Sequence, residues 1–196
     1  MVMRVCMSVV VLLMMLCAQG TLFAGTILKQ AVFAGGCFWC TQSDFEKVDG
    51  VIQVLFGYMG GKGASPDYID YAQKGYIEVV QVTYDPSKIS YAHLLDVFWH
   101  HVDPADAGGQ FVDRGPQYRA AVFYMDEEQK KLAEESKKVL QGSGVFDKPI
   151  VTEIIPASTF YKAKDYHQDY YKTSVKIQVL PVQLGARPVF ERSVGR

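Results

Sequence analysis

The sequence has no excess of charge of either sign. Its 196 residues include 20 basic and 21 acidic side chains, which leaves a formal net charge of −1. No stripe of lysine and arginine runs along the chain, so we expect no nucleic-acid partner. Internal repeats, low-complexity segments and linkers rich in Pro, Gly and Ser are also lacking. With 49% hydrophobic residues, this pattern predicts one ordinary globular domain with a sizeable core.

Long hydrophobic runs are scarce as well. The run at residues 9–16 follows Arg4 and precedes small residues, and it is shorter than the roughly 20 apolar residues of a spanning helix. This arrangement predicts a secretory signal peptide at residues 1–24, with cleavage after Gly20 or Ala24, and no stable membrane span. We therefore expect an exported protein, periplasmic or secreted, whose functional domain occupies residues 27–196.

The sequence has only four cysteines, and two of them would be lost when the predicted signal peptide is cleaved. Cys6 and Cys17 lie in the predicted leader, so the mature chain keeps Cys37 and Cys40. Cys17 also allows a lipid anchor, although the residues before it lack the small side chain expected there. No second cysteine pair and no histidines at zinc-finger spacing accompany these two, so no metal is expected. A structural disulfide over three residues would close almost no loop, and the pair is better explained by chemistry.

The order of the predicted elements indicates an α+β fold, a two-layer sandwich in which a mixed sheet is flanked by helices. Helices are expected from Cys37 toward Lys47, after Ser90 as N-cap, and after Asp126, where Gln129 completes a capping box. Two long loops, Gly60–Gly75 and Asp103–Gln117, are expected to be functional. The β-branched and aromatic segments predict strands at Leu28–Ala34, Val51–Tyr58, Glu78–Tyr84, Arg119–Met125 and Ile150–Ile155.

Cys37 has the setting of a nucleophile. It follows a strand and the Gly35-Gly36 turn and begins a helix, where unpaired amide groups stabilise a thiolate. Cys40 stands one helical turn later, which suits a cycle that forms and resolves a sulfenic acid. A thioredoxin-type exchange enzyme and a protein-binding module with a structural Cys37–Cys40 disulfide remain open alternatives.

The motif Gly36-Cys37-Phe38-Trp39 resembles the signature of the peptide methionine sulfoxide reductase A family. Three further blocks resemble the family in the same order, at residues 57–61, 75–86 and 113–119, and the likeness spans about residue 30 to about residue 185. Many members have glycine where Cys40 stands and place recycling cysteines near the C-terminus. The tail 181–196 contains no cysteine, so Cys40 is expected to resolve the sulfenic acid.

The resemblance implies a role for each matching residue. Cys37 would attack the sulfoxide sulfur, Cys40 would form a disulfide with it, and thioredoxin or a thioredoxin-like protein would reduce that disulfide. Glu78 would protonate the sulfoxide oxygen, assisted by the hydroxyl groups of Tyr68 and Tyr118. Phe38 and Trp39 would bind the substrate methyl group, and Asp113 would order the pocket.

The same resemblance implies the substrate and the partners. The substrate would be the S epimer of methionine sulfoxide, free or in oxidised proteins. We expect no cofactor, and we expect the protein to be a monomer.

Overall fold

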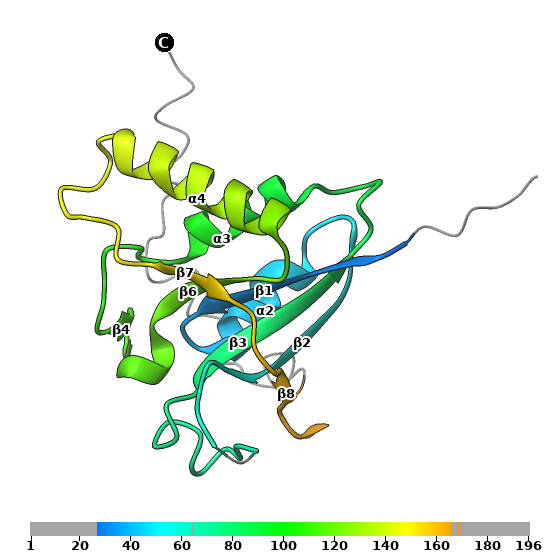
Figure 1. The fold of residues 1–196 in the computed structure, drawn as a ribbon, viewed down its shortest axis with the longest axis vertical. Coiled ribbons are helices and arrows are strands. Elements are labelled where there is room, and N and C mark those ends of the chain that lie inside the picture. The colour runs from blue at the N-terminus through cyan, green and yellow to red at the C-terminus, as the bar shows by residue number, and fades with distance from the viewer. Residues whose placement is uncertain (1–26, 64, 166–167, 169–196) are drawn as a thin grey trace, which may run out of the picture.

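The computed structural model describes residues 27–63, 65–165 and 168, so the predicted leader lies outside the described residues. Within them the chain forms a six-stranded mixed sheet with three helices on one face (Figure 1). This confirms the predicted α+β architecture. No helix in the described part of the chain is long and apolar enough to cross a membrane.

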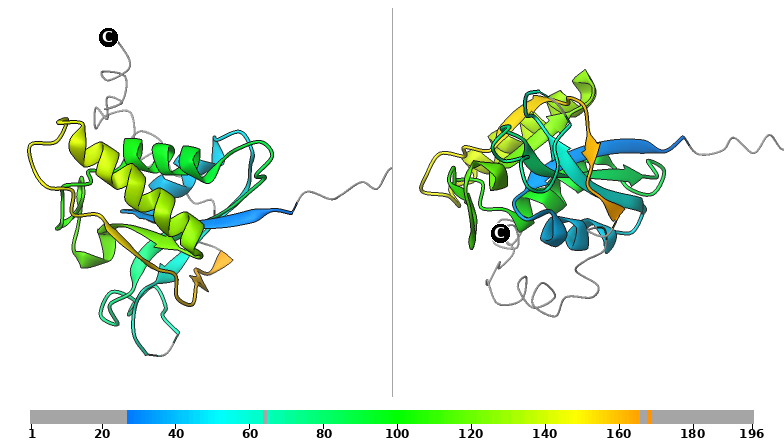
Figure 2. Two further views of the ribbon diagram at one scale, coloured as in Figure 1. Left: turned by 45° about the horizontal axis from the view of Figure 1, so that its top comes forward. Right: turned by 90° about the horizontal axis from the view of Figure 1, so that it is seen from below.

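The sheet has the strand order β7-β6-β1-β3-β2-β8. All neighbours are antiparallel except β6 and β7, which are parallel. The strand bounds are β1 Lys29–Gly35, β2 Val51–Met59, β3 Ile77–Tyr84, β6 Ala120–Tyr124, β7 Glu153–Pro156 and β8 Tyr161–Lys162. Because β7 and β8 lie at opposite edges, the chain between them crosses the face of the sheet away from the helices (Figures 1 and 2).

The three helices begin where the sequence predicts. They are α2 Phe38–Glu46, with Cys37 as N-cap, α3 Tyr91–His101 and α4 Glu127–Gly142. The Ser90 hydroxyl accepts a hydrogen bond from the amide of His93, and the Asp126 carboxylate accepts one from the amide of Gln129. Both N-cap predictions are therefore confirmed.

Three segments differ from the sequence prediction, one of them the short edge strand β8, which was not predicted. The strand predicted at Ile150–Ile155 begins only at Glu153, because the amides of Val151 and Thr152 both bond to the carbonyl of Pro104. The loop predicted at Asp103–Gln117 is not irregular throughout. It contains a small hairpin, β4 Gly109–Gln110 and β5 Asp113–Arg114, and the 3₁₀ helix η1 begins at its end, Pro116–Tyr118.

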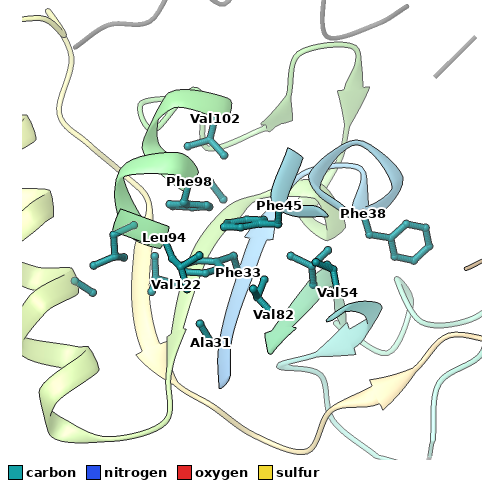
Figure 3. Packing of buried hydrophobic residues seen from close by; sticks show 14 of the residues in the cluster. Ala31, Phe33, Phe38, Phe45, Val54, Val82, Leu94, Phe98, Val102 and Val122 are labelled. Atoms are coloured by element: carbon teal, nitrogen blue, oxygen red, sulfur yellow. The ribbon is translucent and has the colours of Figure 1, made fainter. Parts of the chain in front are cut away.

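Alternation along β1 divides the core between the two faces of the sheet. Ala31 and Phe33 point toward the helices, whereas Val32 and Ala34 belong to the smaller cluster on the opposite face. Figure 3 shows Phe33 below the rings of Phe45 on α2 and Phe98 on α3. Its ring stacks on Phe45 at 4.9 Å and on Phe98 at 5.3 Å between centroids. This packing fixes α2 on the sheet, and with it the cysteine pair.

Candidate active site

The start of α2 places Cys37 between the sheet and the loop at 103–117. Gly36 has φ +89°, which favours glycine, and a Cβ atom at this position would lie 2.6 Å from the Cβ of Gln110. The chain turns sharply here, and the loop packs closely on the residue before Cys37. Cys37 and Cys40 are both half-buried and in the thiol form.

The two thiol groups interact directly. They are hydrogen-bonded to each other, and this bond, followed by burial, raises the pKa of Cys37 above its ordinary value. The nearby Glu78 carboxyl group acts in the same direction. Position at a helix start alone predicts the opposite, a lowered pKa. The second cysteine is thus the largest cause of the raised pKa of Cys37.

Glu78 lies under the first turn of α2 and is only 3% exposed. Its Oε2 atom accepts a hydrogen bond of 2.9 Å from the backbone amide of Phe38, the first residue of the helix. Its Oε1 atom accepts one of 2.7 Å from the Tyr71 hydroxyl. Burial raises the pKa of Glu78 to about 7, although both hydrogen bonds act to lower it; Asp113 adds to the rise. A carboxyl group with this pKa holds a proton near neutrality and can donate it.

Tyr71, rather than Tyr68, supplies the tyrosine hydrogen bond to Glu78. Its ring is buried and stacks on Tyr58 at 4.6 Å, and burial is the main cause that raises its pKa. Tyr68 is 44% exposed, with its ring 6.5 Å from Trp39. The sequence analysis missed Tyr71, and the signal was weak: two tyrosines lie three residues apart in the same loop. Asp67 forms a turn over residues 69–71 that directs Tyr71 inward.

The other predicted residues lie around the same carboxyl group. Tyr118 is half-buried and close enough to Glu78, Tyr71 and Cys37 that each affects its pKa, which burial raises. Asp113 is also half-buried, and burial raises its pKa. The structure therefore brings Cys37, Cys40 and Glu78 together with these two residues.

The two aromatic residues after Cys37 have different environments. Phe38 is 1% exposed and packs on Phe56 and Tyr58, with ring centroids 4.2 and 5.9 Å away. Trp39 is half-buried, so it presents more surface to a substrate than Phe38 does. The ring centroids of Phe38 and Trp39 are 5.4 Å apart, so the buried Phe38 ring packs against Trp39.

The site is built for thiol and acid chemistry. Among the described residues, no three His, Cys, Asp or Glu side chains are grouped so as to hold a metal ion. What the arrangement offers is a nucleophilic sulfur, a second sulfur one turn away and a buried acid between a helix amide and a tyrosine. This set can attack an electrophilic sulfur, protonate its oxygen and close a disulfide.

Comparison with known proteins agrees with this chemistry. The family model described as peptide methionine sulfoxide reductase matches residues 29–191. The protein named MsrA from Streptococcus agalactiae is 51% identical over 149 residues, which are 75% of this chain and 88% of that protein. MsrA from Ligilactobacillus salivarius is 49% identical over 162 residues, 82% of this chain and 94% of that protein.

Solved structures give the same result. The reduced form of Mxr1 from Saccharomyces cerevisiae is 30% identical, with a TM-score of 0.69 over 80% of this chain and 91% of that one. Methionine sulfoxide reductase A of Corynebacterium diphtheriae is 27% identical, with a TM-score of 0.66 over 80% of each chain. The chain thus belongs to the peptide methionine sulfoxide reductase family and is an oxidoreductase.

Proposed function

We propose that the protein reduces methionine S-sulfoxide, free or within polypeptides, to methionine and so repairs oxidised proteins. The observation that carries the proposal is the position of Glu78. It is a buried acid with a pKa of about 7, held by the Phe38 amide and the Tyr71 hydroxyl beside the Cys37–Cys40 pair.

The first step forms a bond between the sulfur of Cys37 and the sulfur of the substrate. A sulfoxide oxygen leaves poorly until it is protonated, and Glu78 supplies that proton. The sulfur–oxygen bond of the substrate and the new sulfur–sulfur bond then break, the protonated oxygen passes to the sulfur of Cys37 as a sulfenic acid, and methionine departs. The thiol proton of Cys37 replaces the proton that Glu78 gave, so the acid is restored.

The second step returns the sulfur to a reducible form. The Cys40 thiol attacks the sulfenic acid, which releases water and leaves a Cys37–Cys40 disulfide. A dithiol protein of the thioredoxin type then reduces this disulfide and is itself oxidised. In this scheme Tyr118 and Asp113 lie beside the substrate oxygen, and Tyr71 positions Glu78. Trp39 and Phe38 bind the methyl group of the substrate.

A dithiothreitol-driven assay on the two separated sulfoxide epimers of a blocked methionine tests the reaction. We expect the S epimer to be converted and the R epimer to remain. The Cys37→Ala variant should show no conversion, because Cys40 has no helix start and no acid beside it. Conversion of both epimers, or turnover by Cys37→Ala, would refute the assignment.

Export belongs to the same proposal. The arginine and apolar run of residues 1–24 have the pattern of a signal peptide, and a repair enzyme outside the cytoplasm would meet oxidised proteins there. Expression of the full chain, fractionation of the cells and mass spectrometry of the N-terminus test this. A chain that keeps residues 1–24 and stays in the cytoplasm would contradict it. We also propose that the enzyme acts as a monomer, which light scattering at assay concentration would check.

A further inference from the structure

The tip of the hairpin β4–β5, Phe111–Val112, is a turn made of residues that rarely occupy such a turn. Gln110 pairs with Asp113, so the turn contains only Phe111 and Val112. Phe111 has φ +51°, and it is the one non-glycine residue with positive φ in the described part of the chain. Two-residue hairpins with positive φ at the first position favour glycine there. An aromatic residue in this conformation is strained, and such strain is concentrated at functional sites.

The tip is exposed although it is strongly apolar. Phe111 is 41% exposed and Val112 is 62% exposed. Neither side chain is hidden in the core, so burial does not explain why two apolar residues occupy a turn that polar residues or glycine would form more easily.

The base of the hairpin holds the tip rigidly beside the active site. The Gln110 side chain accepts a hydrogen bond of 2.7 Å from the amide of Asp103 and donates one of 3.0 Å to its carbonyl. Arg114 forms an ion pair with Asp106, which ties the hairpin to the loop before it. Gln110 packs on Gly36, and Asp113 is near enough to raise the pKa of Glu78. The strands that support the tip therefore lie against the residue before Cys37 and near the carboxyl group of Glu78.

A polypeptide substrate must leave this centre in two directions. An extended chain advances by about 3.3 Å per residue, so a residue three positions from the sulfoxide lies about 10 Å away from it. The tip follows directly after Gln110, which packs on the residue before Cys37, so such a flanking residue can reach the tip. A rigid apolar tip loses little entropy when an apolar side chain covers it. A free amino acid does not extend that far and would not touch the tip.

We propose that the Phe111–Val112 tip docks apolar residues that flank methionine sulfoxide in a polypeptide, an inference that rests on the proposed reductase function. The occupant is an extended, apolar stretch of substrate chain, such as a buried segment exposed by oxidative unfolding. The tip thereby favours damaged polypeptide over free methionine sulfoxide.

The test uses a double variant, Phe111→Asn with Val112→Thr. Asparagine tolerates positive φ and threonine has nearly the shape of valine, so the turn is kept while its apolar surface is lost. The kcat/KM is measured with dithiothreitol on a blocked S-sulfoxide amino acid, on a peptide with Leu and Val beside the sulfoxide, and on the same peptide with Ser and Gln there. The loss on the apolar peptide should exceed the loss on the blocked amino acid by about tenfold, through KM.

Two controls separate docking from a structural role. Val139→Thr changes a 65% exposed valine on α4 and should leave all three values unchanged. Phe111→Leu keeps an apolar side chain in the same backbone conformation and should retain most of the preference for the apolar peptide. Equal losses on all substrates, or no loss on the apolar peptide, would overturn the proposal.

Failure of the proposed function would look different. The wild-type protein would then leave the blocked amino acid sulfoxide unchanged. Docking would still be measured by the fluorescence anisotropy of a labelled apolar peptide, which the double variant should bind about tenfold more weakly than the wild type does. Equal binding of this peptide by both proteins would also overturn the proposal.

Discussion

Replacing Glu78 by glutamine tests the central electrostatic feature of the site. Glutamine has the shape of a protonated glutamate, so its carbonyl can accept from the Phe38 amide and its NH₂ group can donate to the Tyr71 oxygen. It holds no charge at any pH. The variant therefore keeps the contacts of the neutral acid and removes only the titration and the proton that Glu78 donates.

The size of the effect on stability follows from the pKa. Burial raises the pKa of Glu78 from 4.5 to about 7. Each pKa step of one corresponds to about 1.4 kcal/mol, so ionising this carboxyl group in the folded protein costs about 3 kcal/mol more than in the unfolded chain. Because the folded pKa is the higher one, the favourable contribution is complete below about pH 4.5 and is lost as the pH rises through 7.

Urea unfolding of both proteins at pH 5, 6, 7 and 8 measures this difference. The free energy of unfolding of the wild type, relative to that of Glu78→Gln, should fall by about 2.5 kcal/mol between pH 5 and pH 8. Single-turnover release of methionine should be slower in the variant by about 10²–10⁴-fold at pH 7. Parallel stability curves for the two proteins would refute the raised pKa. A rate change below about threefold would show that another group supplies the proton.

The remaining predictions concern three other features of the molecule. Cys40→Ser should release one equivalent of methionine at near the wild-type rate and then stall when thioredoxin is the reductant. Dithiothreitol should sustain partial turnover, because it attacks the sulfenic acid directly. Undiminished turnover with thioredoxin would exclude Cys40 as the resolving residue. Tyr71→Phe removes a hydrogen bond that lowers the pKa of Glu78, so the loss of stability in urea unfolding should extend to higher pH than in the wild type. Tyr68→Phe should leave the pH range of this loss unchanged, and equal behaviour of the two variants would contradict the prediction. Phe33→Ala deletes a fully buried ring and should cost about 3–5 kcal/mol in urea unfolding, and a cost below about 1 kcal/mol would mean that the core repacks around the gap.

The regular elements were predictable because their signals are local. Ser90 and Asp126 each precede an amphipathic run, and a capping side chain needs only the next three residues to act. The strands that carry the core, β1, β2, β3 and β6, are rich in β-branched and aromatic residues and lie side by side in the sheet. The boundary of β7 was not predictable, since it depends on hydrogen bonds to Pro104, almost 50 residues earlier in the chain.

The candidate site was predictable only in part, for the same reason. Cys37 is found from its position at a helix start and Cys40 from its place one turn later, whereas Glu78 is found only because its segment resembles the family motif. Tyr71 is distinguished from Tyr68 by the geometry of one loop turn, which residue type does not encode. The hairpin at Phe111 was missed because its tip lacks the glycine or asparagine that predicts such a turn.

The pKa values of Cys37 and Glu78 together suit an enzyme that works among oxidants. The first amide of α2 bonds to Glu78, so the helix start serves the acid as well as the nucleophile. The hydrogen bond from Cys40 and the surrounding burial raise the pKa of Cys37, and oxidation by peroxides requires the thiolate. A sulfoxide oxygen takes up the proton of Glu78, and the thiol proton of Cys37 then returns to Glu78. In the reaction with a sulfoxide, proton donation by Glu78 therefore compensates for the raised pKa of Cys37.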